Sequence, residues 1–242
     1  MKKCFFIVMM LLIVVSCAEK GIEYSLVEKS LIEENNLVEV NTNFYELVSD
    51  DDNVKEWFDA INSFTYNNII DKIDTLQKHS LADRKMIPEG FHPYILYISD
   101  TVCFKNNFIL SILSTDYTFM GGAHGITQLK AYNYDLINKK ILSADEILNL
   151  AEENKINTLL EKYMHNPDSC FTKKPTIKDV AAVNFMEEFM AFSYEQYILG
   201  PYSCGILTIK VPIKELKPYM LINPNLSKGD VPLKEMEVEE LI

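Results

Sequence analysis

The chain has 242 residues, 48% of them hydrophobic, and its 23 basic and 35 acidic residues give a formal net charge of −12 at pH 7. This length and composition are typical of a folded globular chain with one large or two small domains. Such an acidic chain is a poor binder of nucleic acid, because phosphates attract positive charge, and its charge indicates either a basic partner or a solvated surface that only aids solubility.

The start of the chain has the pattern of a bacterial lipoprotein signal. Two lysines precede an apolar stretch, residues 5–15, and Ser16 stands before Cys17. The stretch is about half of the roughly twenty residues that a membrane-spanning helix needs, and a small residue before the cysteine fits a cleavage site. We therefore expect residues 1–16 to be removed and Cys17 to carry a lipid, with a retained membrane anchor as the alternative.

Residues 17–23 form the lipidated cysteine and a short polar tether in this interpretation, so that the lipid on Cys17 attaches the protein to the membrane. Ala18 stands where some bacteria place an aspartate for retention in the inner membrane. The signal therefore favours the outer membrane of a bacterial envelope, on either its periplasmic or its exterior side.

The first folded residues predict a hairpin and then a helix. Strand-forming residues between positions 24 and 48 flank a turn sequence, Glu33-Glu34-Asn35-Asn36. An acidic stretch, residues 49–53, follows and precedes apolar residues spaced as on a helix from Val54 to Leu76. Acidic groups at the positive end of a helix stabilise it, so this pattern predicts an amphipathic helix.

The centre of the chain predicts an antiparallel meander. A break near residues 88–93 precedes two predicted strands, residues 94–98 and 108–113, and a third, residues 126–134, follows a glycine-rich stretch. Short turns between successive strands are typical of antiparallel neighbours.

The last third of the chain predicts further helices and strands. Ser143 is the expected N-cap of a helix that reaches Tyr163 with one break, and residues 185–194 have strand character. Apolar alternation over residues 206–211 predicts a last strand, after which Pro212 opens a short helix. Hairpins in place of regular strand–helix alternation predict an α+β fold, with helices packed on antiparallel sheets.

Three cysteines remain beyond the predicted signal, namely Cys103, Cys170 and Cys204. One disulfide with one free thiol fits an oxidising envelope, but so low a count favours buried, unpaired cysteines. No spacing fits a cysteine metal site. We expect neither a metal nor a cofactor.

The densest motif is GGAHG at residues 121–125. Its three glycines permit positive φ or a close approach to another group, and the strand predicted after it argues against a phosphate loop, which would lead into a helix. His124 could exchange protons near neutral pH with Asp116 as a nearby acid. The favoured alternative is an imidazole bonded to the backbone of its own turn.

Tyrosines are frequent around the meander and near the end of the chain. They could stack on sugars or form a protein-binding patch, whereas core packing is the more usual role. The aromatic residues concerned are Tyr94, Tyr97, Tyr117, Phe119, Tyr132, Tyr134, Tyr194, Tyr197 and Tyr202.

Several motifs resemble the extracellular domain of unknown function found in RsiV-type anti-sigma factors. The start of that domain is similar to MGGAHG at 120–125, YNYD at 132–135 and ILSADEI at 141–147. Its end is similar to FSYEQY at 192–197, GPYSCG at 200–205 and VPIKEL at 211–216. The helix near Ala60 lies where PdaC-like deacetylases carry a companion amino-terminal module.

The resemblance implies two intimately associated modules. Residues 24–115 correspond to the companion module and residues 116–223 to the RsiV-like domain, followed by an acidic tail, residues 224–242. In such proteins the pair is a non-catalytic envelope unit, and in the RsiV type it senses lysozyme by binding it.

The expected function is therefore that of a lipid-anchored envelope protein that binds a basic protein such as lysozyme, or a cell-wall fragment. The ligand-binding candidates are Gly121, Gly122, His124 and Tyr202. A hydrolase that uses His124 with Asp116 and a purely structural envelope component are the alternatives. We expect neither anti-sigma activity nor deacetylation, and no binding of nucleic acid.

Overall fold

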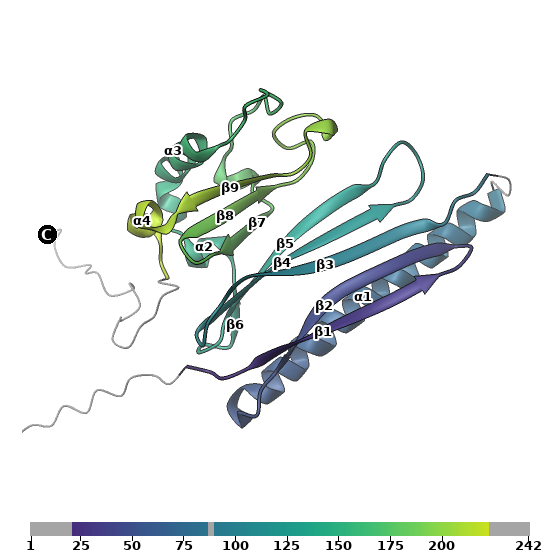
Figure 1. Cartoon of the computed structure of the whole chain (residues 1–242), viewed down its shortest axis with the longest axis horizontal. Helices are drawn as coiled ribbons and strands as arrows, with labels where there is room; N and C mark the ends of the chain where they lie inside the picture. The colour runs from purple at the N-terminus through teal and green to yellow at the C-terminus, as the bar shows by residue number, and fades with distance from the viewer. Residues whose placement is uncertain (1–20, 87–89, 223–242) are drawn as a thin grey trace, which may run out of the picture.

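Two sheets, one long helix and several short helices make up the part of the chain that the structure describes (Figure 1). The computed structural model describes residues 21–86 and 90–222. A six-stranded sheet has the spatial order β1-β2-β3-β4-β5-β6, and a three-stranded sheet has the order β7-β8-β9. This mixture of helices and largely antiparallel sheets confirms the predicted α+β fold.

The six-stranded sheet contains the predicted opening hairpin and the predicted meander. Its strands are β1 (Ser25–Glu34), β2 (Val38–Val48), β3 (Tyr94–Lys105), β4 (Ile109–Phe119), β5 (Ile126–Asp135) and β6 (Lys140–Leu142). Neighbours pair antiparallel except β2 and β3, which are parallel. A parallel pair needs a long crossover connection, and here the crossover is the helix α1 (Asp52–Met86). The sequence predicted this helix but not the parallel pairing.

Helix α1 lies on one face of the six-stranded sheet, where it packs mainly on β2 and β3 (Figure 1). Its buried side chains recur every three or four residues, as a helix with one apolar stripe requires. They are Val54, Phe58, Ile61, Ile69, Ile73, Leu76 and Ser80. The side chain of Asn62 bonds both the N–H and the C=O of Leu47 at 2.9 Å. These two hydrogen bonds fix the helix on strand β2.

The three-stranded sheet consists of β7 (Ala182–Phe185), β8 (Phe189–Tyr194) and β9 (Leu207–Pro212). The prediction of one strand over residues 185–194 was wrong, because a turn at residues 186–188 separates β7 from β8. Both strands are almost entirely buried. Strands buried on both faces give continuous apolar runs instead of alternation, and such a run conceals a tight turn.

Helices cover the three-stranded sheet, as predicted. The helix expected after Ser143 is confirmed with its break, as α2 (Ala144–Ile147), a 3₁₀ turn and α3 (Glu153–Tyr163). The short helix after Pro212 is α4 (Ile213–Leu216). Ile156 and Leu160 of α3 are fully buried in the same apolar cluster as Phe192 and Val211.

A buried polar network joins the two sheets. The Ser111 hydroxyl donates to Asn133 Oδ1 at 2.6 Å and accepts from Asn184 Nδ2 at 3.0 Å and from the Phe185 N–H at 3.1 Å. Asn133 Nδ2 donates to the Val183 carbonyl at 2.8 Å.

The expected boundary between residues 115 and 116 falls inside β4, so one continuous sheet contains strands of both expected modules.

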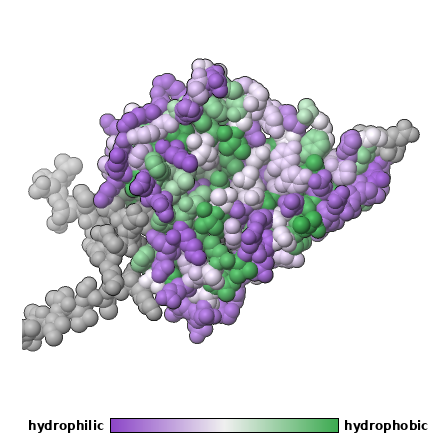
Figure 2. Space-filling model, in the orientation of Figure 1, coloured by the Kyte–Doolittle hydropathy of each residue, from purple (hydrophilic) through white to green (hydrophobic). Residues whose placement is uncertain are grey.

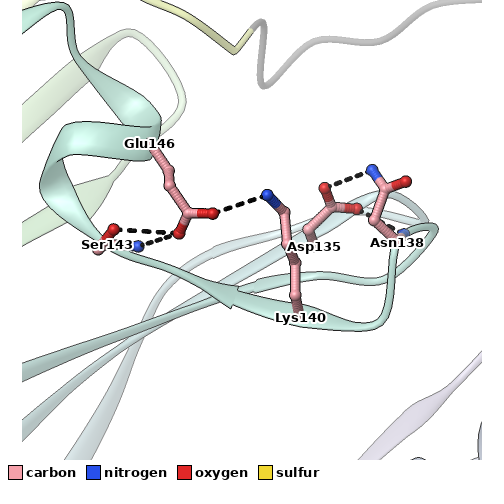
Figure 3. Close-up of polar contacts among 5 residues, drawn as sticks. All are labelled: Asp135, Asn138, Lys140, Ser143 and Glu146. Atoms are coloured by element: carbon pink, nitrogen blue, oxygen red, sulfur yellow. Dashed lines mark hydrogen bonds and ion pairs between the residues drawn. The ribbon is translucent and has the colours of Figure 1, made fainter.

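The start of α2 has the cap that the sequence predicts at Ser143 (Figure 3). Glu146 accepts from the Ser143 N–H at 2.9 Å and from its hydroxyl at 3.0 Å, and Lys140 Nζ lies 2.8 Å from the other carboxylate oxygen. The Lys140 bond, followed by the Ser143 backbone, lowers the pKa of Glu146 to about 2. Beside this cap, the Asp135 carboxylate accepts two bonds from Asn138 and closes the turn before β6.

The prediction of unpaired cysteines was wrong for two of the three. Cys170 and Cys204 form a disulfide with their Cα atoms 5.7 Å apart, and Cys103 is free and partly buried. The two partners are 34 residues apart in the chain, and only folding brings them together.

Among residues 21–86 and 90–222, none of the helices has the length and apolar character that a membrane-spanning helix needs. The predicted signal, Cys17 and the acidic tail lie outside the described residues.

Candidate binding site

The glycine-rich motif forms the turn between β4 and β5. Gly121 and Gly122 have φ values of +86° and +90°, a conformation that side chains disfavour. Gly125 instead allows a close approach, because a Cβ atom there would lie 2.5 Å from the ring of Tyr117. Both predicted uses of the glycines, positive φ and close contact, are therefore confirmed.

This turn presents His124 at the surface, with both ring nitrogens engaged. Nδ1 lies 3.0 Å from the Gly125 carbonyl oxygen and Nε2 lies 2.9 Å from the Tyr197 hydroxyl. Since a carbonyl can only accept, Nδ1 carries the proton and Nε2 accepts from the tyrosine when the ring is neutral. The expected bond between the histidine and its own turn is confirmed.

Two tyrosines complete an aromatic cluster around the histidine. The rings of His124 and Tyr202 are stacked, with centroids 3.7 Å apart and planes inclined by 16°. Tyr197 lies 6.0 Å from His124 and 5.6 Å from Tyr202. We call His124, Tyr197 and Tyr202 the aromatic cluster. It brings together two of the predicted ligand-binding residues, His124 and Tyr202, from positions 78 apart.

The loop between β8 and β9 supplies both tyrosines, and side chains at its start fix it to β5. Glu195 accepts from the Leu129 N–H at 2.7 Å, and Gln196 donates to the Thr127 hydroxyl at 3.1 Å. Tyr197 then takes a φ of +70°, a strained conformation for a tyrosine that costs about 1–3 kcal/mol. Sequence reasoning did not select Tyr197 above other tyrosines, and the pattern offered no sign of its backbone conformation.

Asp116, the other catalytic candidate, does not lie with His124. Its buried carboxylate pairs with Lys72 of α1 and accepts weakly from the Thr118 hydroxyl. Asp116 thus faces the helix, whereas the neighbouring Tyr117 contacts the turn from the opposite face of β4. The structure therefore does not assemble the predicted acid–histidine pair.

Further aromatic and apolar groups extend the surface around the cluster. Tyr117 packs under Gly125 and stacks on Tyr97, with ring centroids 6.0 Å apart. The Tyr97 hydroxyl donates to Glu39, and this bond raises the pKa of Tyr97. Tyr197 is 55% exposed, and Met120 and Ile126, at the two ends of the turn, are 55% and 58% exposed.

The aromatic cluster is a surface feature and not a closed pocket. A cavity of about 750 Å³ lies elsewhere, lined by residues 21–25, 48–51, 53, 136, 137 and 139, none of them in the cluster. On the face drawn in Figure 2, hydrophobic side chains reach the surface among polar ones. Small molecules bind mostly in concave pockets, so an open aromatic surface fits a larger ligand. Among the described residues, no three His, Cys, Asp or Glu side chains are grouped to hold a metal ion.

Comparisons with known proteins agree with this architecture. A family model described as Deacetylase PdaC matches residues 32–127, from β1 through α1 to the start of β5. A DUF3298 family member from Bacteroides fragilis has 19% identity and a TM-score of 0.66, over 85% of this chain and 97% of that one. A DUF3298 protein from Pseudomonas aeruginosa PAO1 has 18% identity and a TM-score of 0.54, over 87% and 99%. No curated protein matches the sequence. The chain is thus similar to the PdaC model over its first strands and helix, and it shares the fold of these DUF3298 proteins over most of its length.

Proposed function

We propose that this chain is a non-catalytic binding protein of the bacterial cell envelope, and that its ligand contacts the aromatic cluster. The observation that carries the proposal is the stack of the exposed His124 ring on the half-buried Tyr202 ring, with the exposed Tyr197 held beside it in a strained conformation. Strained residues gather at functional sites, and tyrosines are enriched in binding surfaces because they offer a large apolar area and a polar end.

The geometry supports binding over acid–base chemistry. A catalytic histidine needs a nitrogen within reach of its substrate and an acid that orients it. Here both nitrogens of His124 are engaged, by Gly125 and Tyr197, and Asp116 is paired with Lys72 on the helix side of the sheet. This arrangement offers the hydrolase alternative no assembled pair of residues.

A protein is the ligand class that fits best. Exposed tyrosine, methionine and isoleucine side chains around one turn are typical of protein-binding surfaces. The net charge of −12 favours a basic partner through long-range attraction. Lysozyme, which is basic and is the partner implied by the RsiV-like motifs, is the first probe, and a soluble cell-wall fragment is the second.

The site is also well placed for a lipid-anchored protein. The described chain begins at Gly21, and the Ile22 N–H bonds the Asn107 carbonyl at 2.8 Å, beside the turn from which β4 starts. The eleven residues of β4 then lead to the glycine-rich turn, about 35 Å away at the usual strand rise. A lipid on Cys17 would thus leave the aromatic cluster at the end of the sheet away from the membrane.

A titration with lysozyme tests the proposal. Isothermal calorimetry at moderate salt should detect binding to the wild type, and Tyr202→Ala should weaken it at least tenfold, as expected when a tyrosine that the ligand covers is truncated. Tyr66→Ala is the matched control, since Tyr66 is an exposed tyrosine of α1. Absence of lysozyme binding, by calorimetry at two temperatures, would exclude the lysozyme-sensing form, and absence of binding to cell-wall fragments as well would overturn the proposal.

Lipid attachment and catalysis require separate tests. Growth with a labelled fatty acid should label the wild type but not Cys17→Ala, and unlabelled wild type would contradict the anchor. Envelope-substrate hydrolysis that disappears in His124→Ala, with the fold intact, would favour the hydrolase instead.

A further inference from the structure

We propose that the Cys170–Cys204 disulfide positions Tyr202 against His124, so that the aromatic cluster is complete only in the oxidised protein. Its consequence for ligand binding rests on the function proposed above. Its consequence for the geometry of the cluster can be measured without any ligand.

The loop that carries the tyrosines is held in different ways at its two ends. At its start, Glu195 and Gln196 bond to β5. At its end, Tyr202 begins a 3₁₀ turn, Tyr202–Cys204, whose hydrogen bonds are local, from Cys204 N–H to Pro201 and from Gly205 N–H to Tyr202. Cys204, two residues after Tyr202, ties this turn covalently to a distant part of the chain.

The segment around Cys170 is itself well fixed. The side chain of Asn166 bonds both the C=O and the N–H of Phe171, at 2.7 and 3.2 Å. The N–H groups of Thr172 and Lys173 both donate to the Leu199 carbonyl, at 2.9 and 3.0 Å. Leu199 belongs to the same loop as Tyr202, so these two bonds hold the middle of the loop, and the disulfide adds a covalent support at its end, two residues from Tyr202.

Packing in the middle of the loop depends on the same support. A Cβ atom at Gly200 would lie 2.8 Å from the Cys170 carbonyl oxygen and 3.2 Å from Cys204 Sγ. The chain between Tyr197 and Tyr202 is thus pressed against the disulfide, and a side chain at position 200 would push it away.

Reduction would remove this support without breaking either sheet. A dithiol reductant breaks the S–S bond and supplies two electrons and two protons, which yields two cysteine thiols and the cyclic disulfide of the reductant. One ring stack is a weak contact compared with the entropy of ordering a turn. Tyr202 should therefore leave His124, while β8 and β9 remain paired.

Proton NMR of the imidazole C–H groups measures this change directly. The chain has four histidines, and His124→Gln identifies the resonances of His124. In the oxidised protein these resonances should be shifted upfield by the stacked Tyr202 ring. A dithiol should move them toward the positions of exposed histidines, and reoxidation should restore them. The variant with both Cys170→Ser and Cys204→Ser should show the reduced positions.

Two controls separate positioning from general stability. Cys103→Ser removes the thiol that is free in the structure and should leave the His124 shifts unchanged. Circular dichroism and methyl dispersion should show that the sheets persist during reduction. Unchanged His124 shifts in the reduced protein would overturn the proposal. It would also be overturned if the His124 shifts changed only when the whole protein unfolded.

Lysozyme titration of the double serine variant, without reductant, tests the consequence for binding, and the affinity should fall at least tenfold. Equal affinity would show that lysozyme does not need the ordered cluster and would overturn this part. If neither protein binds lysozyme but the His124 shifts respond to reduction, the lysozyme proposal fails and the positioning role stands.

Discussion

The two sheets of this protein are stabilised in different ways. The first contains strands of ten to twelve residues in β1 to β5, covered on one face by a helix of 35 residues. The second contains strands of four to six residues, and 3₁₀ turns and a disulfide hold the segments around it. A long regular region can rely on its hydrogen-bond ladder and its apolar face, whereas a short irregular region depends on individual contacts.

The candidate site lies where these two regions meet. The first sheet supplies a turn with His124, and the second supplies the loop with Tyr197 and Tyr202. Binding residues are often carried by loops that a rigid scaffold positions. The comparison indicates that the first sheet provides the platform and that the second region determines whether the aromatic cluster is complete.

The largest expected effect concerns the two cores. Phe58→Ala in the first region and Phe192→Ala in the second should each lower the free energy of unfolding by about 3–5 kcal/mol, because each removes a fully buried ring. Trp57, the one tryptophan, packs on Phe58, so its fluorescence follows the first region while circular dichroism follows the whole protein. Coincident urea transitions in both variants would show one cooperative unit, and an earlier transition by circular dichroism in Phe192→Ala would show two.

A smaller effect is expected from the polar network between the sheets. Ser111→Ala deprives the Phe185 N–H and Asn133 Oδ1 of their partner inside the core, which should cost about 1–3 kcal/mol. The control is Ser30→Ala, at an exposed position of β1, which should change stability by less than about 0.5 kcal/mol. Equal urea midpoints for the two variants would contradict a role of this network in joining the sheets.

Two glycines of the same turn should respond differently. Gly125→Ala places a methyl group against the ring of Tyr117 and should cost about 1–3 kcal/mol by overpacking. Gly122→Ala meets open space at a φ of +90° and should cost about 1 kcal/mol through backbone strain alone, at the lower end of the range for a non-glycine residue at positive φ. Thermal melts would measure both, and a larger loss for Gly122→Ala would contradict the close contact under His124.

The smallest expected effect is the pH dependence at the cap of α2. The folded-state pKa of Glu146 is lowered to about 2, below its ordinary value of about 4.3. Its contribution to stability is therefore complete above pH 4–5 and is lost as the pH falls toward 2. Because Glu146 is partly exposed, the effect should stay below about 1 kcal/mol. As the pH falls over this range, Glu146→Gln should lose less stability than the wild type. Parallel plots of unfolding free energy against pH for the two proteins would contradict the lowered pKa of Glu146.

Patterns within the sequence predicted the first region well. Alternation and helical spacing depend on neighbours in the chain, so the opening hairpin, α1 and the meander could all be predicted, as could the cap at Ser143 in the second region. The same reasoning failed between β7 and β8, because strands buried on both faces carry no alternation to mark their ends.

The candidate site was predicted only in part. The glycines and His124 were recognisable because three glycines around one imidazole restrict the possible backbone conformations, and Tyr202 entered through the RsiV-like motif. The strained backbone of Tyr197 has no signature in the sequence. Asp116 lies on the helix side of the sheet, away from His124, because of the register of β4 and the position of Lys72.

The sequence by itself determined the elements whose causes are local, namely the helices, the hairpins of the first sheet, the cap at Ser143 and the glycine turn. Tertiary structure alone decided the parallel pairing of β2 with β3, the Cys170–Cys204 disulfide and the stacking of Tyr202 on His124. Each of these joins residues far apart in the chain. Their contact depends on how whole elements pack, and no pattern of neighbouring residues encodes it.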